Sequence, residues 1–235
     1  MGTSIPYLYY DILSRIVPGA VTLSVLSMVS YFSQISQVQS LANQRTGQTW
    51  QTITVPVVLL GMCYMIGVVY EVFDYWWPIK RPVEIMDDEA FLWALNRHSD
   101  KADKALYEWV QKCKTGDRSN FLELMGQIRC FKYGMWNDLL FLGGSKPEMG
   151  PLFAHCHRFQ AEHKMFLHLI YPSMVFVALS FADGHVWQGF IGLGVTVMFS
   201  YSSRERNRRR WLQVLISSRR LSLRDANADR CFARS

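Results

Sequence analysis

The sequence lacks the motifs that mark most enzyme classes. It has no GxGxxG, Walker loop, GxSxG or HExxH motif, and no paired carboxylates within an apolar helix. Each of these arrangements holds a phosphate, a nucleophile or a metal, so hydrolases, kinases and dinucleotide enzymes have no support. We therefore expect no enzyme activity, no catalytic residue and no cofactor.

Cysteine is sparse and carries no pairing pattern. The five cysteines show no CxxC spacing, and four of them lie in segments that we expect in the cytosol, where thiols stay reduced. We expect free thiols. His155 and His157 are two residues apart on an expected helix and point to different sides, so no metal site is predicted. The cysteines are Cys63, Cys113, Cys130, Cys156 and Cys231.

Charge is missing from a long apolar stretch. No charged residue lies between Ile53 and Tyr70, the aromatic residues 75–77 follow, and Lys80 and Arg81 come next. Roughly 20 apolar residues in a helix span the hydrocarbon layer, while aromatic rings collect at the headgroups and basic residues on the cytosolic side. The stretch predicts a membrane helix that ends in the cytosol.

Three other stretches follow the same pattern. Together they predict an all-α membrane protein with four transmembrane helices and a helical cytosolic module between helices 2 and 3. Both termini and all basic clusters then lie on the cytosolic side of the membrane. The boundaries are a hairpin over 1–81 with spans at about 12–36 and 53–73, the module over 82–164, a hairpin over 165–203 with spans at about 165–182 and 187–203, and an Arg-rich tail over 204–235.

The module has helical spacing and balanced charge. Its predicted helices cover Pro82 to Arg97, Asp100 to Cys113 and Asn120 to Leu142. A fourth helix is expected to start near Met149 or Pro151 and to run unbroken into the third span.

One face of the first span is polar. Its serines and glutamines fall within an arc of about 140° on a helix. Such a face either packs on other helices through small and polar side chains or lines a pore. The pore-lining candidates are Ser24, Ser27, Ser30, Gln34 and Gln37.

Two acidic residues mark the inner end of the second span. Glu71 and Asp74 are three residues apart, and we expect them to pair with Lys80, Arg81 or the Arg-rich tail. The alternative is a ring of acids that attracts cations to a pore mouth. The middle of each span holds no charged residue, which argues against a proton-coupled transporter.

The tail carries the net charge of the chain. Residues 204–235 hold 10 Arg against 3 acidic residues, whereas the whole chain has a net charge of +6. These arginines could anchor the chain to anionic lipid, hold a nucleotide or nucleic-acid signal through their guanidinium groups, or bind a partner protein. The candidates are Arg204, Arg206, Arg208, Arg209, Arg210, Arg219 and Arg220.

One spacing points to a possible nuclease. Arg158 and His163 form an Arg-x4-His pair that resembles the catalytic motif of HEPN ribonucleases, helical proteins in which Arg and His act on RNA. Phe159 departs from the polar residue usual in that motif. With 17 Arg and 6 His in the chain, about one such match is expected by chance. A membrane-tethered HEPN-like ribonuclease is therefore an alternative.

The opening stretch YDILSRIVPGA, with YDxxxRxxPG spacing from Tyr10 to Gly19, adds a resemblance. Together with the four spans, the helical insert and the Arg-rich end, it resembles membrane subunits of bacterial anti-phage systems, namely the Hailong channel subunit and the Kiwa membrane sensor. The resemblance implies a homo-oligomer, with a tetramer favoured, that a nucleotide or an operon-encoded cytosolic partner keeps closed.

The resemblance also implies that infection opens the membrane subunit and that the open subunit depolarises the cell. Such a response is called abortive infection. The sequence thus predicts an antiviral effector that acts as a nucleotide-gated ion channel or pore. A non-catalytic membrane sensor or scaffold that recruits a cytosolic partner is a further alternative.

Overall fold

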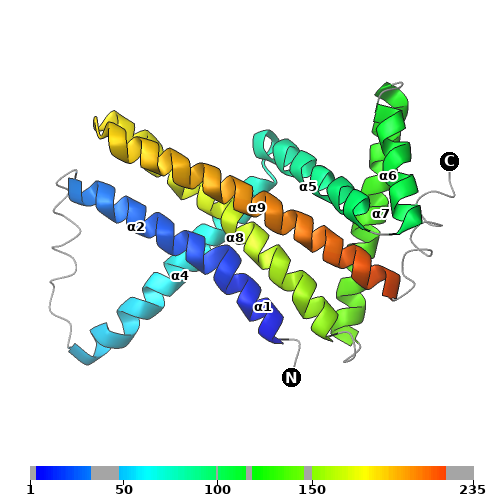
Figure 1. Ribbon diagram of the computed structural model, residues 1–235. Coiled ribbons are helices and arrows are strands. Elements are labelled where there is room, and N and C mark those ends of the chain that lie inside the picture. The colour runs from blue at the N-terminus through cyan, green and yellow to red at the C-terminus, as the bar shows by residue number, and fades with distance from the viewer. Residues whose placement is uncertain (1–3, 33–47, 99, 115–117, 146–149, 221–235) are drawn as a thin grey trace. The chain divides into compact units, whose positions relative to one another are not determined.

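The computed structural model describes residues 4–32, 48–98, 100–114, 118–145 and 150–220. The elements within these residues are all helical, which confirms the all-α class (Figure 1). In chain order they are α1 (Ser4–Asp11), the π-helix η1 (Ile12–Ile16), α2 (Val17–Phe32), α4 (Gln48–Asp74), α5 (Trp77–Arg97), α6 (Lys101–Lys114), α7 (Arg118–Ser145), α8 (Gly150–Ala182) and α9 (Val186–Arg220).

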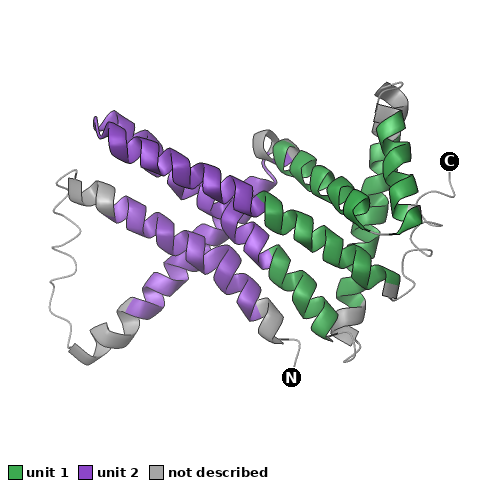
Figure 2. Cartoon of the chain, viewed as in Figure 1, with its two compact units in different colours: residues 1–7, 81–160, 204–235 green, residues 8–80, 161–203 purple. Residues whose placement is uncertain are grey.

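The chain divides into two compact units (Figure 2). Unit 1 comprises residues 1–7, 81–160 and 204–235, and unit 2 comprises residues 8–80 and 161–203. The long helices α8 and α9 each contribute residues to both units. The described part of the Arg-rich tail thus belongs to the same unit as the segment that follows the second predicted span.

The core of unit 1 is aromatic and fully buried. Phe91 on α5 meets Phe131 on α7 with ring centroids 6.3 Å apart, and meets Trp211 on α9 at 5.4 Å, both edge to face. Each ring is at most 1% exposed, and burying such a side chain contributes about 1.5–3 kcal/mol. The core residues recur every three or four positions, as in Phe91, Ala94 and Leu95, so each helix buries one face.

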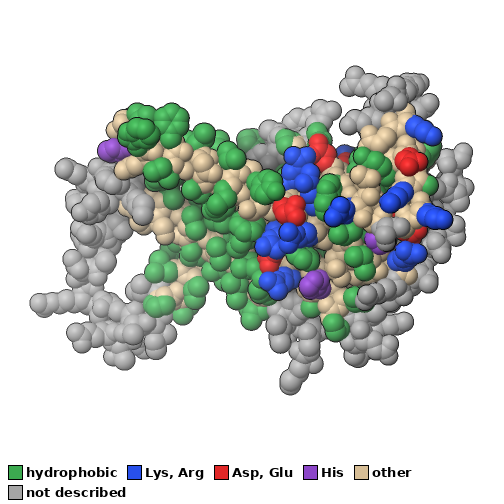
Figure 3. All heavy atoms as spheres, viewed as in Figure 1, with side chains coloured by type: hydrophobic (Ala, Val, Ile, Leu, Met, Phe, Trp, Pro, Cys, Tyr) green, Lys and Arg blue, Asp and Glu red, His purple; other side chains and the backbone are tan. Residues whose placement is uncertain are grey.

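Unit 2 has the opposite distribution of side chains. Long stretches of α4 and α9 keep large apolar side chains exposed, and hydrophobic side chains are spread over the face of unit 2 seen in Figure 3, whereas charged side chains gather on unit 1. Soluble monomers rarely leave apolar patches of this extent bare. The exposed side chains include Val57, Val58, Leu59, Leu60, Met62, Met65 and Val69 on α4, and Trp187, Phe190, Ile191, Leu193, Val197 and Met198 on α9.

Two helical segments among the described residues are long and apolar enough to cross a membrane, judged by length and composition. They are Pro56–Asp74, of which 17% is buried, and Pro151–Ala182, of which 39% is buried. They correspond to the second and third predicted spans. The first predicted span runs past Phe32 into residues outside the described ones, and glycines and serines dilute the fourth. The four-span topology stays a prediction.

Helix boundaries agree with the expected ones to different degrees. α8 runs unbroken from Gly150 to Ala182, as expected for the helix that enters the third span. α5 begins at Trp77, five residues before the expected start, because Pro82 is accommodated inside the helix. The expectation of free thiols holds for Cys63 and Cys156 and is wrong for Cys130, which is disulfide-bonded. Sequence spacing cannot show that two cysteines approach to within about 4 Å at Cβ.

Candidate functional site

The candidate site lies in unit 2, where η1 and α2 pack on α4. Two glycines permit this packing. A Cβ built on Gly19 would overlap the backbone of Cys63, and one built on Gly67 would overlap the backbone of Arg15. Only glycine allows two helix backbones to approach so closely. The contact brings polar side chains of η1 against the second half of α4.

Arg15 joins η1 to α4 through several hydrogen bonds. Its Nη1 donates to Asp11 Oδ1 and to the Tyr64 hydroxyl, both at 2.6 Å. Its Nη2 donates to Glu71 Oε2 at 2.8 Å, and the Tyr10 hydroxyl donates to the other Glu71 oxygen at 3.2 Å. Both terminal nitrogens of Arg15, Nη1 and Nη2, thus donate to oxygen atoms. These charge-assisted hydrogen bonds hold the guanidinium in place between η1 and α4.

Pro18 leaves a backbone acceptor for α8. Proline has no N–H, so Pro18 cannot make the α-helical hydrogen bond to the Ser14 carbonyl four residues earlier. His168 on α8, 0% exposed, supplies a donor instead, with Nδ1 2.8 Å from the Ser14 oxygen. A carbonyl oxygen only accepts hydrogen bonds, so Nδ1 of His168 carries a hydrogen.

The other imidazole nitrogen faces an acid. Nε2 of His168 lies 3.1 Å from Asp74 Oδ2, the Lys164 ammonium donates to the same oxygen, and Tyr171 donates to Asp74 Oδ1 at 3.1 Å. Tyr70 stacks on Tyr171 with ring centroids 5.0 Å apart. The last residue of α4 is thus bound by three side chains of α8.

Glu71 and Asp74 have partners that we did not expect. Arg15 binds Glu71, and residues of α8 bind Asp74. Both acids follow Gly67 on α4, by four and seven residues, and so share with it the face that meets η1. The expected pairing with Lys80, Arg81 or the tail stays a prediction.

Sequence reasoning also missed His168. The signal was present, because His168 lies inside the apolar predicted span 165–182, one helical turn after Lys164, and an ionisable group in such a span marks a polar face.

The pore-lining candidates are described only in part. Ser24 and Ser27 are exposed, and their hydroxyls donate to the Ala20 and Leu23 carbonyls at 2.9 and 2.7 Å. Ala20, Ser24 and Ser27 thus form an exposed stripe of small residues along α2. The Ser30 side chain, Gln34 and Gln37 lie outside the described residues.

Several tail arginines on the surface of unit 1 are paired with acids. Arg204 donates to Glu89 at 2.6 Å, and Arg209 donates to Glu205 at 2.9 Å. Arg208 is 4.0 Å from the same Glu205 carboxylate. An anionic ligand at these arginines would have to displace Glu89 and Glu205. Among the other candidates, Arg219 lies 3.3 Å from Asp100, Arg206 is partly exposed, and the Arg220 side chain lies outside the described residues.

Arg210 differs from the other tail arginines because it is buried, at 7% exposure. It donates to Asp87, which also accepts from Lys132 at 2.6 Å, Trp211 Nε1 at 2.8 Å and Tyr133 at 3.3 Å. Burial by itself raises the pKa of Asp87, but the charges of Arg210 and Lys132 and the hydrogen bonds outweigh it and hold the pKa well below its usual range. Arg210 therefore stabilises the interior of unit 1 through its ion pair with Asp87.

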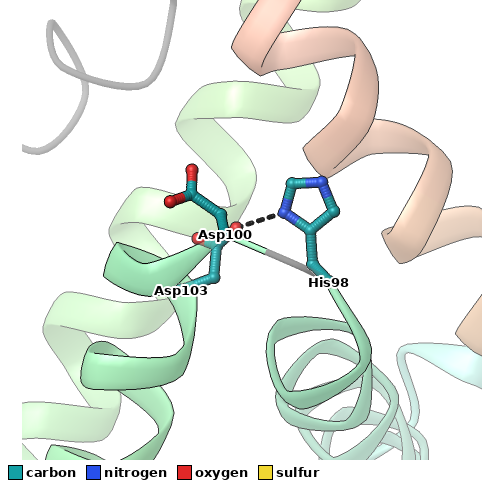
Figure 4. A group of neighbouring side chains, drawn as sticks. All are labelled: His98, Asp100 and Asp103. Carbon is teal, nitrogen blue, oxygen red and sulfur yellow. Dashed lines mark hydrogen bonds and ion pairs between the residues drawn. The ribbon is translucent and has the colours of Figure 1, made fainter.

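A second polar group in unit 1 has metal-ligand types. His98, Asp100 and Asp103 each offer a ligand atom, all within 4.8 Å of one another, at the corner between α5 and α6 (Figure 4). His98 Nδ1 is already hydrogen-bonded to Asp103 Oδ2 at 2.5 Å, and Arg219 pairs with Asp100. A cation would have to break both contacts. We therefore interpret the three side chains as a structural contact between α5 and α6.

The two residues of the nuclease alternative, Arg158 and His163, differ in their exposure to solvent. Arg158 is exposed, whereas His163 is 3% exposed and its Nδ1 lies 2.9 Å from the Ser203 hydroxyl. An imidazole that cleaves RNA must reach the substrate, and His163 is buried against α9.

No protein-family model matches this chain, and no curated protein or solved structure does so either.

Proposed function

We propose that the protein is a homo-oligomeric inner-membrane effector of antiviral defence that conducts ions when it opens. One observation carries the proposal: the surface of unit 2 exposes large apolar side chains, whereas its interior encloses ionisable side chains. Val57, Leu60 and Met65 are exposed on α4, whereas Asp74 and His168 are 5% and 0% exposed. Lipid solvates the first set, and ionisable groups enclosed by membrane helices mark ion pathways and gates.

In this proposal unit 2 crosses the bilayer with four helices, and unit 1 lies in the cytosol with both termini. The α2 stripe of Ala20, Ser24 and Ser27 supplies the contact between subunits. Small residues let α2 helices of neighbouring subunits approach closely, and their hydroxyls offer water and ions hydrogen bonds once the helices separate. A tetramer is the favoured assembly.

Unit 1 receives the opening signal. Arg204 on α9 pairs with the exposed Glu89, and Arg209 pairs with the partly exposed Glu205. A phosphate of a nucleotide or nucleic acid binds such guanidinium groups bidentately and competes with those acids. An operon-encoded partner with an acidic surface would act on the same residues.

Currents through the purified protein in planar lipid bilayers test the proposal. Ser24→Leu with Ser27→Leu should abolish conductance, because leucine closes the path along α2. Ser200→Leu is the matched control: Ser200 on α9 is also exposed and also donates to a carbonyl of its own helix, at 2.9 Å from Thr196 O. Its conductance should stay at the wild-type level.

The absence of current with every nucleotide and oligonucleotide tried would overturn the channel. If toxicity in cells then required the active site of a cytosolic partner, the scaffold alternative would stand in its place. If His163→Ala abolished toxicity while currents persisted, the ribonuclease alternative would gain the support that the burial of His163 now denies it.

A further inference from the structure

We propose that Asp74 and His168 share a bound proton, and that this proton latches η1, α4 and α8 together. The ligand of the site is thus H⁺. The existence of the proton follows from the geometry alone, whereas its effect on conductance rests on the proposed function.

The first step concerns the imidazole. The Ser14 carbonyl accepts from His168 Nδ1 at 2.8 Å, so Nδ1 is a donor. In a neutral imidazole the other nitrogen then has only a lone pair. That nitrogen lies 3.1 Å from Asp74 Oδ2, so two lone pairs would face each other unless a proton lies between them. The contact therefore contains a proton, on His168 or on Asp74.

The second step places the proton. Lys164 donates to Asp74 Oδ2, and Tyr171 donates to Asp74 Oδ1 at 3.1 Å. Hydrogen bonds from a cation and a hydroxyl favour the ionised carboxylate. The proton accordingly resides on His168, as an imidazolium between a carbonyl and a carboxylate. Tyr70 also faces it, with ring centroids 6.0 Å apart.

The third step is the consequence of losing the proton. Neutral His168 cannot donate to Ser14 and to Asp74 at once, so one of the two contacts must break when the proton passes to water. Asp74 keeps Lys164 and Tyr171, which are both on α8, but either the His168 link to η1 or the His168 link to α4 is lost. The packing of η1, α4 and α8 then loosens, and we expect conductance to rise with pH.

Nitrogen NMR of ¹⁵N-histidine-labelled protein in lipid nanodiscs tests the proton directly. A solvated imidazole is mostly neutral at pH 7.5, since its ordinary pKa is about 6.5. We expect both nitrogens of His168 to carry hydrogen at pH 7.5 in the wild type and only Nδ1 to do so in Asp74→Asn. His168→Asn assigns the signals by removing them. A single-proton His168 in the wild type at this pH would overturn the proposal.

Conductance against pH tests the latch. Asp74→Asn should conduct at neutral pH where the wild type is closed, and Asp183→Asn, the same change at an exposed acid of unit 2, should behave as the wild type. If Asp74→Asn fails to fold, His168→Asn, which keeps a donor for Ser14, should lose the pH dependence. If the conductance of the wild type, Asp74→Asn and His168→Asn depended on pH in the same way, the latch would be overturned.

The two proposals fail separately. A doubly protonated His168 in a protein that passes no current leaves the proton site standing and removes the channel. Currents with a neutral His168 remove the proton site and leave the channel.

Discussion

Gly19 on α2 lies directly against the carbonyl group of Cys63 on α4, with no room for a side chain between the two backbones. Its neighbour in sequence, Pro18, frees the carbonyl that His168 binds. The two residues therefore do different work in one place: glycine sets the distance between helices, and proline supplies the acceptor for a third helix.

Substituting this glycine tests the helix contact. Gly19→Ala should destabilise unit 2, because the new methyl group can only be accommodated by moving α2 away from α4, at a cost of about 1–3 kcal/mol for overpacking. The matched control is Gly61→Ala on α4, where an added Cβ would meet nothing within 4 Å. Thermal unfolding in detergent should show a lower midpoint for the first variant and an unchanged or higher one for the second.

A lysine on the apolar surface tests the membrane assignment. Leu60 is 53% exposed within Pro56–Asp74, so Leu60→Lys should reduce membrane integration by placing a charge in hydrocarbon, at about 2.5–3.5 kcal/mol. Phe141 in unit 1 is 75% exposed, and Phe141→Lys should integrate normally. Alkaline extraction of membranes measures both. Full retention of Leu60→Lys would show that this face of α4 does not meet lipid.

Removing the charge of Asp87 should destabilise unit 1. Asp87→Asn removes the acidic partner of the buried Arg210, whereas Lys132 keeps Asp88 at 2.6 Å, and breaking a buried pair in this way costs about 3–5 kcal/mol. Glu89→Gln is the control, because Glu89 and its partner Arg204 are about half exposed, and such pairs contribute at most about 1 kcal/mol. Denaturant unfolding followed by tryptophan fluorescence would contradict this view if both variants matched the wild type.

The same carboxylate predicts an acid sensitivity. The pKa of Asp87 is lowered in the folded state, so its contribution to stability is present above the unfolded pKa of about 3.9 and is lost as pH falls toward the folded value. The stability of the wild type should therefore fall below about pH 4, and Asp87→Asn should fall less steeply there. Unfolding midpoints measured from pH 3 to 7 in both proteins would reveal parallel curves if Asp87 were not the cause.

The candidate site could be predicted from the sequence only in its parts. Glu71 and Asp74 stood out as acidic residues at the end of an apolar stretch. Their partners did not, because Arg15 meets Glu71 across 56 residues of chain and His168 meets Asp74 across 94. The tail shows the same limit: Arg210 was one of the arginines expected to bind lipid, a phosphate-bearing signal or a partner protein, yet it is buried on Asp87, 123 residues away.

The amino-acid sequence by itself determined that the chain is helical, where its most apolar segments lie, and that α8 continues without a break, because helical period and hydropathy are properties of neighbouring residues. Only the tertiary structure decided which charges are enclosed, which face of α4 stays bare, and that His168 sits between a carbonyl and a carboxylate. Those outcomes depend on which helix faces meet, and the neighbouring Pro18 and Gly19 on α2 decide that together with His168, which lies far away in the chain on α8.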